Sequence, residues 1–265
     1  MLFWIIAITA GLIIGSFLNV VIYRGPALWG LTGHDEDPPR GNLAFPRSYC
    51  PDCRTQINAP HLIPVLGYFL LKGKCANCTA PISPRYLLVE LTGGAITGVA
   101  IAAFGFSFAA AFFAIFGWLL LALAIIDFDT TFLPDMLTLP LAAIGLTAAA
   151  AGIFIDFLPG VIGAAAGYGV FWAISAAYRR WRGVEALGLG DAKLLGALGA
   201  WTGWQALPAI ILIGSLATLS VIAASALRGK KVSTQTALPF GPGLCLGGFI
   251  ILLANSPMVN TLWPL

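Results

Sequence analysis

FAAAFFAIFGWLLLALAIID, residues 108–127, is an apolar run that ends on a carboxylate. A helix needs about 20 consecutive apolar residues to cross the hydrocarbon core of a bilayer. Residues 108–126 therefore predict a membrane-spanning helix with Asp127 at its end. A carboxylate at a membrane boundary is costly to remove from water and is usually retained for function.

The composition of the whole chain extends this interpretation. With 59% hydrophobic and 9% charged residues, the 265-residue chain cannot form a soluble domain. It predicts an all-α, polytopic bundle of about eight transmembrane helices. The expected spans are 2–23, 87–104, 108–126, 136–155, 159–178, 192–204, 207–227 and 240–262. The span at 192–204 is short for a bilayer.

The positions of the basic residues predict the orientation. Thirteen of them follow spans one, five and seven: Arg24, Arg40, Arg47, Arg54, Lys72, Lys74, Arg85, Arg179, Arg180, Arg182, Arg228, Lys230 and Lys231. With eight spans these segments share one face, and the opposite loops near Gly105, Asp156 and Gly203 carry no Lys or Arg. The positive-inside rule makes the basic face cytoplasmic and places both termini outside.

Three parts of the chain follow from this topology. Residues 1–23 form the first transmembrane helix, 24–86 a small cytoplasmic domain, and 87–265 the remaining membrane domain. The cytoplasmic segment holds two C-x2-C pairs, Cys50-Pro-Asp-Cys53 and Cys75-Ala-Asn-Cys78. This spacing is typical of zinc-ribbon-like sites, where four thiolates complete a tetrahedral zinc and leave no open position for substrate. We expect structural Zn²⁺.

Two other interpretations of the cysteines are open. Two disulfides are disfavoured because the expected compartment is reducing. A single iron on four thiolates would suit electron transfer, but the sequence shows no other redox motif. Cys245, in the last span, is expected to be a small packing residue.

A second carboxylate, Asp191, lies in Gly-Leu-Gly-Asp-Ala-Lys, residues 188–193. Asp127 ends the third span and Asp191 begins the sixth, so both lie on the cytoplasmic side and can share one pocket. Two neighbouring carboxylates do not both ionise cheaply, so one can act as base toward water and the other as acid toward a leaving amine. Alternatively, Asp191 could cap its helix and Asp127 could be an ordinary interfacial acid.

Three motifs in order carry a resemblance to a known family: Asp127-Phe-Asp-Thr-Thr-Phe-Leu-Pro-Asp135, Gly188-Leu-Gly-Asp-Ala-Lys-Leu-Leu195 and Pro239-Phe-Gly-Pro242. The chain closely resembles the type IV prepilin peptidases. The likeness includes Gly15-Ser-Phe-Leu-Asn-Val-Val-Ile-Tyr-Arg24, the cysteine pairs and Ile82-Ser-Pro-Arg-Tyr-Leu-Leu-Val-Glu90, and so covers nearly the whole length.

The resemblance implies an inner-membrane aspartic endopeptidase that removes the leader of type IV prepilins or type II secretion pseudopilins after a glycine, on the cytoplasmic side. Asp127 and Asp191 match the catalytic pair. It also implies methylation of the new N-terminus with S-adenosylmethionine as methyl donor. Glu90 could bind that donor, pair with Arg85 or Lys193, or reach the interface. The expected partners are prepilins or pseudopilins and the lipid bilayer, and no nucleic acid.

Departures from the family pattern concern the methyl transfer. Leu62-Ile-Pro-Val-Leu-Gly-Tyr68 replaces Asn-Ile-Pro-Leu-Leu-Ser-Trp, and Tyr49 replaces a frequent His. Two rival functions are open. A proton-coupled transporter would carry its carboxylates near the midplane. A presenilin-like intramembrane protease shares the Gly-x-Gly-Asp motif, but the cysteine domain and the superficial aspartates favour the prepilin peptidase.

Overall fold

The computed structural model describes residues 2–31, 41–182, 188–228 and 239–262. Arg40, Lys230 and Lys231 lie outside these ranges, so their part in the predicted basic face is not described. The described residues form helices and no strands, with two isolated β-bridges in the cysteine segment. The expected all-α membrane class is confirmed. The chain divides into two compact units, Met1–Ala102 and Ala103–Leu265, and each is described by itself.

The first unit contains two long helices around the cysteine segment. They are α1 (Leu2–Leu28) and α3 (Pro84–Phe104), whose last two residues belong to the second unit. The short helices η1 (Ala59–Leu62) and α2 (Leu66–Leu70) lie between them in sequence. A Cβ on Gly15 would lie 2.8 Å from Cα of Glu90, and one on Gly93 would lie 2.7 Å from the Gly11 oxygen. Glycines therefore let α1 and α3 pack at backbone distance.

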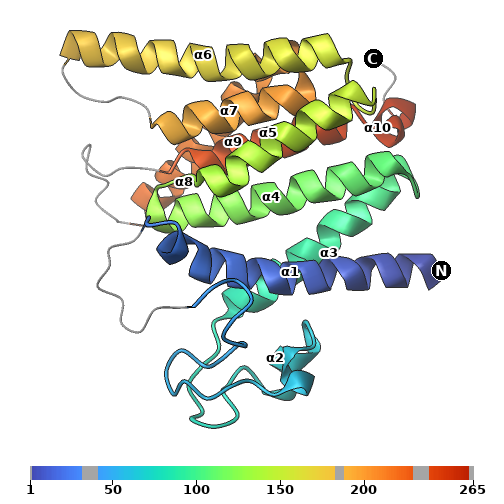
Figure 1. Cartoon of the computed structure of the whole chain (residues 1–265), viewed down its shortest axis with the longest axis vertical. Coiled ribbons are helices and arrows are strands. Elements are labelled where there is room, and N and C mark those ends of the chain that lie inside the picture. The colour runs from blue at the N-terminus through green and yellow to red at the C-terminus, as the bar shows by residue number, and fades with distance from the viewer. Residues whose placement is uncertain (1, 32–40, 183–187, 229–238, 263–265) are drawn as a thin grey trace. The chain divides into compact units, whose positions relative to one another are not determined.

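The second unit is a bundle of helices (Figure 1). Its elements are α4 (Phe108–Thr130), α5 (Asp135–Ala150), α6 (Phe157–Arg182), α7 (Leu189–Thr202), η2 (Trp204–Ala206), α8 (Leu207–Leu227), α9 (Gly241–Ala254) and α10 (Pro257–Leu262). Helix α7 packs against α6, α5 and α9, and α9 packs against α4 and α8. The helices that carry Asp127 and Asp191 thus share α9 as a neighbour.

Helix α7 forms the centre of this unit, since nearly every residue from Ala192 to Thr202 is buried. A Cβ on Gly163 of α6 would collide with the backbone oxygen of Gly199, and one on Gly199 with that of Gly163. Trp201 is fully buried, and its indole N–H donates to the Leu141 carbonyl at 2.7 Å. The close approach of Gly199 to Gly163 fixes α7 against α6. The hydrogen bond of the Trp201 indole fixes α7 against α5.

The predicted count of eight spans is not confirmed. A helix lies at each predicted place, but only five described helices are long and apolar enough to cross a membrane: α1, α3, α4, α6 and the segment Trp204–Leu227. Helix α5 ends at Ala150, ahead of the predicted 155, where Gly152 adopts a φ of +64°. The predicted span 240–262 is two helices, because the chain turns at Asn255–Ser256 before Pro257 starts α10.

Candidate active site and metal centre

Asp127 lies in the last turn of α4 and is 4% exposed. Its helix ends just beyond it, where Thr131 adopts a left-handed conformation and its N–H donates to the Asp127 carbonyl at 2.8 Å. The carboxylate accepts a hydrogen bond from the backbone N–H of Gly241 at 3.0 Å. This N–H stabilises negative charge on Asp127.

Gly241 begins α9, and the sequence assigned it no role beyond its place in the motif Pro239–Pro242. A Cβ at this position would lie 2.6 Å from Oδ2 of Asp127. Only glycine lets the backbone N–H approach the carboxylate this closely. The one signal in the sequence was a glycine before a proline at a helix start.

Asp191 is the third residue of α7 and is half-buried. The N-cap residue is Gly188, which makes no side-chain cap, and the Asp191 N–H donates to the Gly188 carbonyl at 3.1 Å. A helix-capping role for Asp191 is therefore wrong. The next glycine, Gly190, packs against Leu133 in the segment between α4 and α5, since a Cβ on Gly190 would lie 3.1 Å from Cβ of Leu133.

The two aspartates lie close enough to interact electrostatically, although 64 residues separate them in sequence (191 − 127). Buried Cys245 of α9 lies within electrostatic range of both. Among the described residues, no N–H or side chain hydrogen-bonds the Asp191 carboxylate, whereas Asp127 has Gly241. At this end of the bundle, one carboxylate, that of Asp127, accepts a backbone hydrogen bond, and the other, that of Asp191, accepts none from the described residues.

A salt bridge lies beside this pair. Lys193 Nζ donates to both carboxylate oxygens of Asp135, at 2.7 and 2.8 Å. Asp135 is the first residue of α5, and Lys193 lies two residues beyond Asp191 on α7. The sequence left Lys193 as a candidate for a salt bridge without naming this partner. The bridge ties the start of α5 to the turn of α7 that carries Asp191.

The four cysteines of the first unit converge, with all four sulfur atoms within 4.8 Å of one another. Cys50 Sγ lies 3.8 Å from Cys78 Sγ, and Cys53 Sγ lies 3.9 Å from Cys75 Sγ. Four sulfurs at about 2.3 Å from a tetrahedral zinc lie about 3.8 Å apart. The cluster therefore fits a single four-coordinate ion, and none of the four cysteines forms a disulfide.

Both cysteine pairs have the same local backbone. The N–H of Cys50 donates to the Thr55 carbonyl, and the N–H of Cys75 donates to the Ala80 carbonyl. The residue after each pair, Arg54 and Thr79, has a positive φ of 59° and 61°. These tight turns point both sulfurs of a pair toward one point.

Hydrogen bonds also favour the metal-binding form of one thiol. Those from Thr55 and Asn77 lower the pKa of Cys53 to about 6. A metal binds the thiolate, so a lowered pKa makes Cys53 a better ligand near neutral pH.

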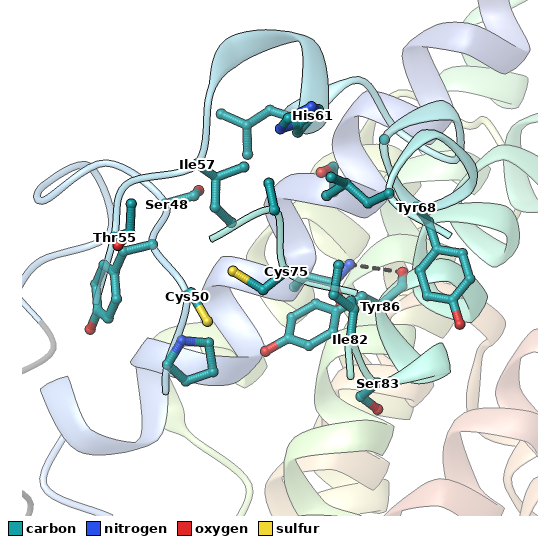
Figure 2. A pocket seen from close by; sticks show the side chains of 18 of the residues that line it. Ser48, Cys50, Thr55, Ile57, His61, Tyr68, Cys75, Ile82, Ser83 and Tyr86 are labelled. Carbon is teal, nitrogen blue, oxygen red and sulfur yellow. Dashed lines mark hydrogen bonds between the residues drawn. The ribbon is translucent and has the colours of Figure 1, made fainter. Parts of the chain in front are cut away.

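Glu90 of α3 lines a cavity of about 580 Å³ inside the first unit. Its Oε2 accepts the backbone N–H of Val65 at 2.7 Å. Figure 2 shows Ile57, Cys75 and Tyr86 around this cavity. The structure thus assigns Glu90 a backbone partner and a place in a cavity wall. Lys193, one of the partners considered for Glu90, pairs with Asp135 instead.

Comparisons with known proteins agree across the chain. Residues 9–104 match the bacterial peptidase A24 N-terminal domain, and residues 114–223 match the type IV leader peptidase family. The chain is 44% identical to a prepilin leader peptidase/N-methyltransferase of Burkholderia pseudomallei, over 95% of this chain and 85% of that protein. It is 39% identical to the protein of that name from Pseudomonas aeruginosa, over 98% and 93%. No solved structure matches it significantly.

Proposed function

The chain belongs to the type IV leader peptidase family. We therefore propose that it cleaves the leader of type IV prepilins or type II secretion pseudopilins after a glycine, and then methylates the new N-terminus. The observation that carries the proposal is that Asp127, in the last turn of α4, and Asp191, in the first turn of α7, lie within electrostatic range of each other on two helices that both pack on α9. Family membership decides against the transporter and the presenilin-like protease.

Asp127 and Asp191 divide the chemistry of hydrolysis between them. Asp127 is the base, because the Gly241 N–H stabilises its ionised form. It takes a proton from water as the water oxygen attacks the scissile carbonyl. Asp191 holds the shared proton and gives it to the leaving amine as the carbon–nitrogen bond breaks. Neither the activation of water nor the protonation of the leaving amine is efficient without the other, so both carboxylates are required.

Zinc is the metal that we propose for the cysteine cluster. Cys50, Cys53, Cys75 and Cys78 would fill its coordination shell, and their spacing supports this assignment. With no open position, the ion would stabilise the cysteine segment and take no part in either reaction. S-adenosylmethionine would supply the methyl group, which is bonded to a positively charged sulfur. The new N-terminal amine accepts this methyl group.

We place the protein in the bacterial inner membrane, with the cysteine segment and both aspartates facing the cytoplasm. The distribution of Lys and Arg supports this orientation. Prepilins inserted with their basic leader in the cytoplasm would then present the cleavage site to the aspartates. The bilayer and the substrate are the expected partners.

Removing each carboxylate tests the peptidase. Purified Asp127→Asn and Asp191→Asn should leave a prepilin uncut, whereas Asp129→Asn, which changes an exposed acid of the same helix, should cut it. Resolving the processed band by gel electrophoresis measures this. Cleavage by either of the first two variants would remove the aspartate pair from the mechanism.

A further inference from the structure

The short helix α2 carries apolar side chains that the fold leaves uncovered. Leu66, Phe69 and Leu70 are 57%, 62% and 65% exposed, and Ile63, just before the helix, is 47% exposed. Residues three and four apart are neighbours on a helix surface, so the three helical side chains form one face. Contiguous exposed apolar groups of this kind mark a surface that a partner covers.

The opposite side of α2 faces the inside of the first unit. Gly67 is buried, and it lines the cavity of about 580 Å³ together with Tyr68 and Leu71. Ser16 of α1 and Glu90 of α3 line the same cavity. Figure 2 shows Tyr68 among the side chains around it. One side of α2 therefore packs against the unit while its apolar face points outward.

A hydrogen bond holds α2 beside α3. The N–H of Val65, at the start of α2, donates to Oε2 of Glu90 at 2.7 Å. Val65 has a φ of 65°, which β-branched residues rarely adopt. This strained turn sets the direction in which α2 starts, and the bond to Glu90 keeps the start of α2 against α3.

The place of Glu90 along α3 gives the depth of α2 in the membrane. Helix α3 is one of the five helices long and apolar enough to span a bilayer, and Glu90 lies six residues after its start at Pro84. With a rise of about 1.5 Å per residue, Glu90 lies about 9 Å inside the start of α3. Amphipathic helices on a membrane bury their apolar face about 5–10 Å into the boundary of headgroups and acyl chains. Helix α2 therefore lies at the depth where lipid would cover its apolar face.

The charges next to α2 complement an anionic surface. Lys72 and Lys74 follow the helix directly and are exposed. Residues 53–89 contain no Asp or Glu but four basic residues, Arg54, Lys72, Lys74 and Arg85. Anionic lipids of the cytoplasmic leaflet attract basic residues beside membrane helices, and lysine can lay its methylene chain on apolar surface while its ammonium reaches a phosphate. An apolar face with adjoining lysines is typical of a helix that lies in the membrane surface.

We propose that α2 is an interfacial anchor: Leu66, Phe69 and Leu70 insert between lipids of the cytoplasmic leaflet, and Lys72 and Lys74 bind the phosphates of anionic lipids. The anchor adds an attachment to the bilayer for a segment that α1 and α3 already tether at both ends. The inference rests on the cytoplasmic placement of this segment and on neither of the two reactions.

Photo-crosslinking of the full-length protein in lipid vesicles tests the anchor. The photoreactive amino acid p-benzoylphenylalanine replaces Phe69 in one variant and Asp52, an exposed residue of the first cysteine turn, in another. In vesicles of phosphatidylethanolamine and phosphatidylglycerol, the probe at position 69 should form lipid adducts. The probe at position 52, outside the anchor, should form far fewer. Mass spectrometry of the digested protein measures both yields.

Further substitutions in the chain with the probe at position 69 separate the two parts of the anchor. Lys72→Gln combined with Lys74→Gln should lower the adduct yield several-fold in the anionic vesicles and leave it unchanged in phosphatidylcholine vesicles. Leu66→Ser combined with Leu70→Ser should lower the yield in both kinds of vesicle, because less apolar area is inserted. Arg180→Gln, which removes an exposed arginine of α6, should leave the yield unchanged. Size-exclusion chromatography in detergent checks the folding of each variant.

Equal lipid adducts at positions 69 and 52, or none at position 69, would overturn the anchor. A crosslinked dimer in place of lipid adducts would assign the face to a second copy of the chain. A crosslink to a prepilin in the same vesicles, again in place of lipid, would assign it to the substrate. Either result overturns the proposal. Lipid adducts at position 69 in a chain that cleaves no leader would support the anchor while contradicting the proposed peptidase.

Discussion

Gly241 lacks a side chain, and this lets its backbone N–H reach the Asp127 carboxylate. Gly241→Ala places a methyl group about 2.6 Å from Oδ2 of Asp127 and so displaces the carboxylate or the start of α9. Misplacing a catalytic group by about 1 Å costs on the order of 100-fold in rate, and we expect a loss of that size in leader cleavage. Gly98→Ala, in open space, should cleave normally. Initial rates on one prepilin compare the two, and equal rates would mean that the Gly241 contact is dispensable.

Single residues were predictable from the sequence where their chemistry is rare in a membrane. Asp127, Asp191 and the four cysteines stood out because charges and paired thiols are few among apolar residues. The residues that contact them in the fold could not be identified from the sequence. Gly241 meets Asp127 across 114 residues, and Asp135 meets Lys193 across 58. Such pairs depend on how helices approach one another, which spacing along one helix does not encode.

The packing of α6 against α7 gives a prediction at the scale of elements. Gly163→Ala pushes a methyl group into the backbone of Gly199, and overpacking of this kind costs about 1–3 kcal/mol of stability. Gly169→Ala, on the same helix but in open space, should stabilise instead, by up to about 1 kcal/mol. Thermal unfolding in detergent measures both. A melting temperature of Gly163→Ala at or above that of Gly169→Ala would contradict this packing.

The cysteine turns carry a second prediction at this scale. The purified protein should hold about one zinc per chain, because four thiolates complete one tetrahedral site. Cys50→Ser should lose the metal, while Cys245→Ser, which changes a cysteine outside the cluster, should keep it. Elemental analysis gives the ratio. Stoichiometric iron, or zinc retained by Cys50→Ser, would speak against the assignment.

Helices were easier to predict from the sequence than their ends. Apolar runs gave a helix at each expected place, since hydrophobic length is a local property. The ends depend on single turns. The break before α10 comes at Asn255–Ser256 inside an apolar segment, and the extension of α6 to Arg182 carries three arginines beyond the apolar run. Neither follows from hydropathy alone.

At the scale of the whole molecule, the proposed orientation predicts which loops face outward. Phe106→Cys lies between α3 and α4, and Phe132→Cys lies between α4 and α5; both positions are exposed. A maleimide that cannot cross membranes should label the first variant in intact cells and the second only after the inner membrane is opened. Mass shift on a gel reports the labelling. The reverse pattern would place the aspartates on the outer side.

The proposal that leader cleavage needs the aspartate pair and methyl transfer does not is tested most directly by offering one variant two substrates. Purified Asp191→Asn, supplied with S-adenosylmethionine, receives either an intact prepilin or the same pilin already cut after the glycine, and mass spectrometry reads the N-terminus. We expect the intact prepilin to stay uncut and unmethylated, because the aspartate pair is incomplete, and the pre-cut pilin to gain one methyl group. Cleavage of the intact prepilin, or failure to methylate the pre-cut pilin under conditions where the wild type does so, would show that the two reactions are not separate in this way.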